Sequence, residues 1–192
     1  VFSPSANLSS TCRAAEVDPT GAEWPQFRGP TGQGVSTAAG LPVTWSDTEN
    51  VTWKVEVPGQ GWSSPVIRGE KIWLTTADEN PRTLRALCLD RKTGVIQKNI
   101  VVGTPEPLGT VHKKNTLASP TAILEGDRVY VHFGPYGTAC LSEAGDILWK
   151  TTLPHVQGYG PSSSPVLYRD LLIVPCLGTD FLRSEEHTSE LQ

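Results

Sequence analysis

The sequence predicts an all-β fold, a fragment of a β-propeller with about two and a half four-stranded antiparallel blades. One pattern occurs three times: a Ser-Pro pair leads, across a short turn, into a run of aliphatic and aromatic residues. The prolines of the copies are Pro65, Pro120 and Pro165, so the steps are 55 and 45 residues. A period of this size built from β-type segments is typical of propeller blades. The 18 glycines and 16 prolines supply the turns that many short strands require.

A second marker supports the same period. Residues 53–58 (WKVEVP) match residues 149–154 (WKTTLP), 96 positions later, which is twice 48. Since this marker is independent of the Ser-Pro pairs, a repeat of blade length is the interpretation that accounts for both.

Each complete unit divides into four short strands at its turn residues. In the first unit we expect strands at about 63–67, 71–76, 84–89 and 95–102. In the second unit we expect strands at about 118–124, 128–134, 138–142 and 146–153. Their Val, Ile, Leu and aromatic residues suit strands buried on both faces. The third unit stops after its second strand, near 171–176, and we expect that strand to lie unpaired along one side.

The two ends of the chain differ from this pattern. Residues 1–23 are small and polar without periodicity, and are predicted to be a disordered leader. Residues 183–192 (RSEEHTSELQ) resemble a translated sequencing adapter and are interpreted as a non-native tail. The partial propeller domain is therefore expected at 24–182.

Composition excludes two classes of partner. The formal net charge is −4, which argues against nucleic acid because phosphate binding needs a basic surface. No stretch approaches 18 consecutive apolar residues, so no transmembrane segment is predicted.

Two segments give the repeat a specific resemblance. Residues 87–94 (LCLDRKTG) and 140–149 (CLSEAGDILW) resemble the repeat of pyrroloquinoline-quinone (PQQ) enzymes and their non-enzymatic relatives, which runs roughly Leu-Tyr-Ala-Leu-Asp-x-x-Thr-Gly-x-x-Leu-Trp. In that repeat the Asp-to-Gly stretch forms an outer turn, and the tryptophan wedges between adjacent blades. The second unit keeps the tryptophan as Trp149, whereas the first has Lys98 in its place. The resemblance therefore implies a weaker contact between blades at Lys98.

Further stretches widen the resemblance. Residues 24–30 (WPQFRGP) and 129–134 (VYVHFG) are similar to a bacterial, planctomycete-type subgroup of PQQ-repeat proteins, and the repeat also resembles the lipoprotein propeller of outer-membrane assembly. The resemblance implies a parent ring of seven or eight blades. It also implies that residues 51–57 form the closing strand of the last blade.

The resemblance allows two functions. The first is a non-catalytic binding or protein-interaction scaffold of the bacterial cell envelope, periplasmic or secreted, with no cofactor. The alternative is a PQQ- and calcium-dependent alcohol or sugar dehydrogenase. The adjacent-cysteine pair of PQQ alcohol dehydrogenases is absent from this sequence, which favours the first. No catalytic residue and no metal ligand is predicted.

Cysteine positions indicate buried thiols. Cys88 and Cys140 occupy equivalent places in successive units, and equivalent places on packed sheets lie about 10 Å apart. A disulfide needs Cα atoms within about 7 Å, so both are expected to act as small hydrophobes, as is Cys176. His132 alternates with apolar neighbours along its strand and is expected to be a hydrogen-bonded interior histidine rather than a ligand or base.

The candidate binding residues lie in loops between strands, where ligands usually bind. They are His112, Lys114 and Asn115 in the connection 103–117, with the glycine-flanked aromatics Trp62 and Tyr159. The predicted partner is a protein or a small polar, sugar-like ligand. Two alternatives remain open: the cluster is a solvated basic loop, and the aromatic rings cap their blades.

Overall fold

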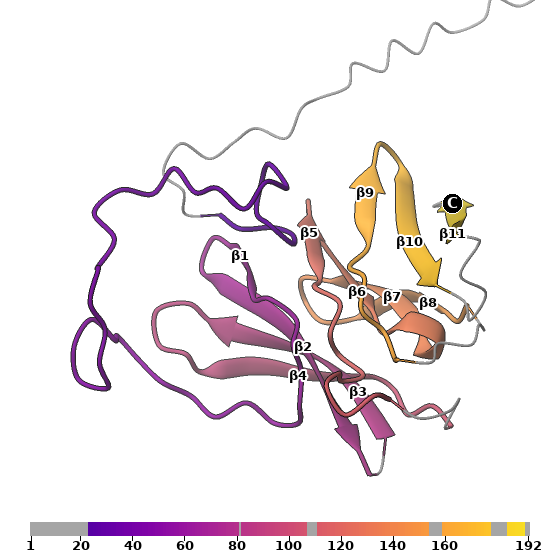
Figure 1. The fold of residues 1–192 in the computed structure, drawn as a ribbon, viewed down its shortest axis with the longest axis horizontal. Coiled ribbons are helices and arrows are strands. Elements are labelled where there is room, and N and C mark those ends of the chain that lie inside the picture. The colour runs from indigo at the N-terminus through magenta and orange to yellow at the C-terminus, as the bar shows by residue number, and fades with distance from the viewer. Residues whose placement is uncertain (1–22, 81, 107–110, 154–158, 178–183, 191–192) are drawn as a thin grey trace, which may run out of the picture.

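The computed structural model describes residues 23–80, 82–106, 111–153, 159–177 and 184–190. Their strands form antiparallel sheets, as predicted (Figure 1). Blade 1 comprises β1 (Val66–Arg68), β2 (Lys71–Glu79), β3 (Arg82–Asp90) and β4 (Ile96–Gly103). Blade 2 comprises β5 (Ile123–Glu125), β6 (Arg128–His132), β7 (Thr138–Ser142) and β8 (Ile147–Thr151), with a 3-10 turn at Gly134–Tyr136. Blade 3 comprises β9 (Val166–Tyr168), β10 (Leu171–Leu177) and β11 (Ser184–Glu190). Within the described residues no helix could cross a membrane.

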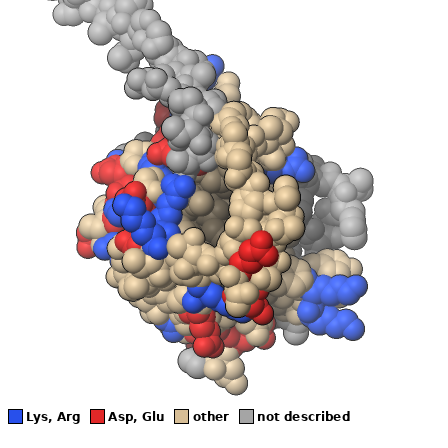
Figure 2. Space-filling model, turned by 90° about the vertical axis from the view of Figure 1, so that its left-hand side faces the viewer, with Lys and Arg blue, Asp and Glu red and all other residues tan. Residues whose placement is uncertain are grey.

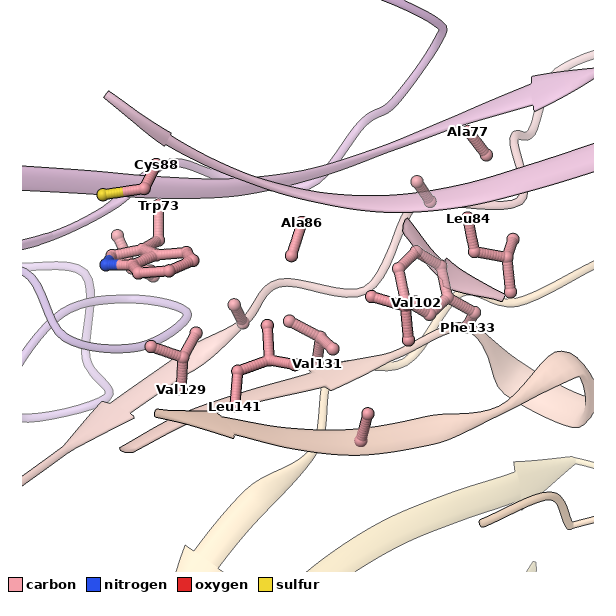
Figure 3. Close-up of a cluster of buried hydrophobic side chains, with 14 of the residues drawn as sticks. Trp73, Ala77, Leu84, Ala86, Cys88, Val102, Val129, Val131, Phe133 and Leu141 are labelled. Atoms are coloured by element: carbon pink, nitrogen blue, oxygen red, sulfur yellow. The ribbon is translucent and has the colours of Figure 1, made fainter. Parts of the chain in front are cut away.

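Each blade is a meander in which strands pair in chain order. Blade 1 runs β1-β2-β3-β4 and blade 2 runs β5-β6-β7-β8. The two sheets face one another across a core, which Figure 3 shows in close-up. Trp73 of β2 is 1% exposed in this core and lies opposite Val129 and Leu141 of blade 2.

Blade 2 is buried on both of its faces. Val129 and Val131 point into the core shared with blade 1, whereas Tyr130 between them packs toward Leu172 and Val174 of blade 3. Because successive side chains of a strand point to opposite faces, a strand between two blades must be apolar at every position. The continuous apolar runs of the sequence are explained by this arrangement.

The innermost strands are shorter than predicted. β1 begins at Val66 rather than at 63, and β5 begins at Ile123 rather than at 118. Pro65 has no N–H to donate to a neighbouring strand. Ser63 bonds to the backbone of Thr75 through its side-chain hydroxyl rather than through its own backbone. The Ser63 hydroxyl donates to the Thr75 carbonyl and accepts from the Thr75 N–H, both at 3.1 Å.

Residues 51–57 form no strand in this structure, so their expected role as the closing strand of the last blade of a parent ring stays a prediction. The ring of Trp53 connects this segment to blade 1. The indole Nε1 donates to the Arg91 carbonyl at 2.9 Å, and the ring lies directly over Gly94 in the β3–β4 turn. A β-strand requires a hydrogen-bonded partner strand, and none of the described strands pairs with this segment. The Trp53 indole can pack on the β3–β4 turn without such a partner.

The same contact recurs between blades 1 and 2 with a different side chain. Lys98 lies opposite Cys88 in the β3–β4 register, as Trp149 lies opposite Cys140 in the β7–β8 register. Lys98 is therefore the repeat equivalent of Trp149, as predicted. Its aliphatic stem covers Gly145 of the next blade, with Cδ 3.3 Å from the place that a Cβ would occupy there.

The expectation that the strand near 171–176, now β10, lies unpaired along one side is wrong. β11 pairs along the whole of β10, from Leu171 opposite Glu190 to Leu177 opposite Ser184. A free strand edge presents N–H and C=O groups that any extended segment can satisfy, whatever its side chains. Residues 184–190 thus take the third-strand position of blade 3. Their non-native origin stays a prediction.

One buried hydroxyl in blade 1 makes no hydrogen bond. Thr76 Oγ1 is buried without a partner in the described part of the chain, and such a group carries a desolvation penalty of about 1–3 kcal/mol. We expect Thr76→Val to raise the free energy of unfolding by about 1 kcal/mol. Thr75→Val is the matched control, because the Thr75 hydroxyl donates to the Pro120 carbonyl at 3.3 Å, and we expect it to lower that free energy. Urea midpoints that shift in the same direction for both variants would contradict this account.

Candidate functional site

A single cavity of about 880 Å³ brings the candidate residues together. Four segments line it: residues 26–32, Trp62, residues 112–121 and residues 159–166. All five candidate residues, His112, Lys114, Asn115, Trp62 and Tyr159, belong to its wall. In the sequence, Trp62 lies 50 residues before His112 and 97 residues before Tyr159. The stacking of the blades brings the three side chains to one cavity.

Backbone contacts hold Trp62 at the cavity. Gln60 exchanges two hydrogen bonds of 2.8 Å with Ala77 at the end of β2. A Cβ on Gly61 would lie 2.5 Å from the Thr75 carbonyl oxygen, so only glycine permits this approach. The Trp62 N–H then donates to the Ala118 carbonyl at 3.0 Å, which leaves the indole 61% exposed.

Asn115 joins two walls of the cavity. Its Nδ2 donates to the carbonyls of Tyr159 at 2.8 Å and Pro161 at 3.0 Å. Its Oδ1 accepts from the Thr116 N–H at 2.8 Å and from the Ser119 hydroxyl. An amide offers two donor and two acceptor positions, and all four are occupied. Asn115, expected as a ligand contact, thus uses its amide to join two segments of the wall, and its expected ligand contact stays a prediction.

His112 and Tyr159 form an aromatic pair across the same junction. Their ring centroids lie 5.3 Å apart, and the rings are tilted by 52°. His112 Nδ1 accepts a hydrogen bond from the Lys114 N–H at 3.2 Å. The neutral ring therefore carries its proton on Nε2, the other nitrogen. The Tyr159 ring is 68% exposed.

Two cations of the cavity wall lack counter-charges. Neither Arg28 nor Lys114 forms an ion pair with a described residue, and no carboxylate side chain belongs to the wall. Elsewhere charges of both signs are interspersed, as Figure 2 shows for one face. The cavity is thus a locally positive region on a chain whose net charge is −4.

Sequence reasoning missed Phe27 and Arg28 as site residues. Residues 24–30 served there only as a marker of resemblance. Arg28 has a positive φ of 63°, a conformation that costs a non-glycine residue about 1 kcal/mol or more and that clusters at functional sites. Its guanidinium carbon lies 5.9 Å from the centre of the Phe27 ring. The Arg-Gly-Pro turn was the available signal, but the position of its side chains depends on the neighbouring blades.

The other expectations concern buried side chains. Cys88 and Cys140 are buried and free, as predicted. Burial raises the pKa of the Cys88 thiol to about 11 and also raises the pKa of Cys140, so both stay protonated at neutral pH. His132 is buried and its Nδ1 lies 2.8 Å from the Thr138 hydroxyl, which confirms the interior histidine. The side chain of Cys176 lies outside the described residues.

Comparison with known proteins supports the repeat assignment. The family model described as outer membrane protein assembly factor BamB matches residues 31–175, about three quarters of the chain. The chain belongs to this family. The match extends over blades 1 and 2, β9 and the first five residues of β10, and β11 lies beyond it.

Solved structures similar to this BamB-family chain include both dehydrogenases and an assembly factor. A europium-containing methanol dehydrogenase is 17% identical, with a TM-score of 0.46 over 66% of this chain and 22% of its own. BamB from Moraxella catarrhalis is 14% identical, with a TM-score of 0.47 over 64% and 36%. A quinohemoprotein alcohol dehydrogenase from Comamonas testosteroni is 15% identical, with a TM-score of 0.45 over 62% and 18%. The chain therefore spans at most 36% of these proteins, and no curated protein matches it significantly.

Proposed function

We propose that the chain is part of a non-catalytic propeller of the bacterial cell envelope, periplasmic or secreted, that acts as a binding or protein-interaction scaffold. The observation that carries the proposal is the composition of the cavity wall. Exposed aromatic rings, together with cations that form no ion pair with a described residue, converge on one space, an arrangement suited to holding a ligand. Membership of a family described by an assembly factor supports the same function.

The positions of these groups are set by rigid neighbours. The Asn115 amide links the segment 112–119 to the carbonyls of Tyr159 and Pro161. Gly61 packs closely on the Thr75 carbonyl of β2 and so positions the adjacent Trp62. A wall that is ordered before binding loses less conformational entropy on binding, which is the physical advantage of preorganisation. His112, Lys114, Trp62 and Tyr159 are the contact residues of the proposal.

The dehydrogenase alternative requires PQQ and calcium. Calcium takes six to eight oxygen ligands, usually with several carboxylates among them. The cavity wall offers no carboxylate side chain, and the described residues contain no cluster of three or more His, Cys, Asp or Glu that could hold a metal. The residues present therefore do not fit the calcium-bound quinone, and we derive no reaction step through it.

Calorimetry with PQQ tests the non-catalytic assignment. We expect no calcium-dependent, saturable binding of PQQ to the 192-residue protein and no reduction of an electron-accepting dye with alcohols or sugars. The titration without calcium is the control, because a tricarboxylate could bind weakly to the positive cavity by charge alone. A calcium-dependent Kd below about 10 μM, equivalent to roughly −7 kcal/mol, would overturn the assignment.

A further inference from the structure

We infer that the cavity binds an anionic saccharide, with a sugar ring stacked on the exposed aromatics and its acidic group held by Arg28 and Lys114. The inference rests on the proposed binding function and names its ligand class. Two independent features of the wall lead to it: cations that form no ion pair with a described residue, and exposed aromatic rings.

The cations favour an anion. Arg28 and Lys114 belong to the same wall, and neither forms an ion pair in the described part of the chain. Two positive charges that line one cavity make its potential positive, which attracts an anion. A guanidinium presents a planar fork of donors that matches the oxygens of a carboxylate or sulfate.

The aromatic rings require a flat, partly apolar partner. The structure has five strongly exposed aromatic side chains among its described residues, Phe27, Trp45, Trp62, Tyr159 and Tyr168, and three of them line this cavity. Phe27, Trp62 and Tyr159 are 50%, 61% and 68% exposed. The C–H face of a pyranose ring covers such a surface while its hydroxyls stay hydrated or bond to polar neighbours.

Two backbone donors beside the cavity are already bonded to side chains. The Ser64 N–H donates to the Thr121 hydroxyl, and the Thr121 N–H donates to the Ser164 hydroxyl, both at 3.0 Å. Neither N–H is therefore free for a peptide strand, which binds through backbone groups along an edge. Exposed Ser162 adds a hydroxyl to the cavity wall.

The size of the cavity sets the length of the ligand. Its volume of about 880 Å³ lies within the usual range of ligand sites, about 300–1,000 Å³, and holds a short oligosaccharide. A trisaccharide of galacturonic acid is therefore a suitable probe, and its neutral galactose counterpart removes only the charge.

Calorimetric titration of the 192-residue protein tests the inference. We expect saturable binding of trigalacturonate, with a Kd of about 100 μM, and binding of the neutral trisaccharide at least tenfold weaker. Each of Arg28→Gly, Lys114→Gln and Trp62→Ala should weaken binding about tenfold. Glycine is chosen at 28 because it adopts the positive φ without strain, so the variant keeps the backbone. Lys113→Gln is the matched control, since that neighbouring exposed lysine lies outside the wall and its loss should leave the Kd unchanged.

Two further ligands distinguish the sources of an anion. Tetraglutamate that binds as tightly as trigalacturonate would assign the cavity to acidic peptides and overturn the inference, and inorganic sulfate that binds as tightly would reduce it to an anion site. If trigalacturonate does not bind to protein whose urea midpoint shows that it is folded, the inference is also overturned. That result would leave the scaffold proposal standing, because only calcium-dependent PQQ binding contradicts that proposal.

Discussion

Replacing Gly94 with alanine is expected to lower the free energy of unfolding by about 2 kcal/mol more than the same replacement at Gly69. Both glycines have positive φ, 73° and 54°, so both variants strain the backbone. A Cβ at position 69 meets no atom within 4 Å, whereas at position 94 it would lie 2.4 Å from the Trp53 ring. The additional loss comes from this overlap, and forced overpacking typically costs about 1–3 kcal/mol.

A double-mutant cycle tests whether the indole is the cause. In a Trp53→Ala background the two glycine substitutions should cost the same, because the atom that Cβ would meet has been removed. Denaturant midpoints measure all the variants. A difference between the Gly94 and Gly69 substitutions that persists without Trp53 would show that the ring does not pack on this turn.

The Trp149→Ala substitution is expected to cost about 3 kcal/mol, and Lys98→Ala about 1 kcal/mol or less, although the two residues are equivalent in the repeat. Trp149 packs against Tyr130, with ring centroids 6.3 Å apart, in the cluster between blades 2 and 3. Truncating a large aromatic that packs between sheets removes several kcal/mol of burial. Lys98 covers Gly145 with its aliphatic stem alone, so its truncation exposes far less apolar surface.

Urea unfolding of the two single variants decides between these values. Lys98→Met serves as the control, because it keeps the stem that contacts Gly145 and removes only the charge. We expect its midpoint to equal or exceed that of the unchanged protein. Equal losses for Trp149→Ala and Lys98→Ala would contradict a stronger junction between blades 2 and 3.

Much of the fold could be predicted because a blade repeats its own local rules. The register confirms this at Lys98 and Trp149, which lie opposite equivalent cysteines, as the repeat alignment requires. The errors occurred where hydrogen bonds do not follow the repeat pattern. Ser63 satisfies the backbone of Thr75 with a side-chain hydroxyl, and β11 supplies the third strand of blade 3. Neither event leaves a signal in local periodicity.

The candidate site was predicted in part for the same reason. Loop position and residue type were sufficient to select His112, Lys114, Trp62 and Tyr159, which the structure places around one cavity. They were not sufficient to separate Asn115, whose amide is saturated by three backbone groups and the Ser119 hydroxyl, from the residues with exposed groups. Arg28 entered the site only through the folded arrangement.

The sequence alone determined the β-propeller class and the equivalent positions in the blades, since strand alternation and turn residues are local properties of the chain. It also determined that Cys88 and Cys140 are buried thiols, because their spacing follows the repeat. Only the tertiary structure decided which loops share a cavity and which cations there form no ion pair with a described residue. Those properties depend on how one blade stacks on the next, and stacking joins segments such as 26–32 and 159–166 that are more than a hundred residues apart.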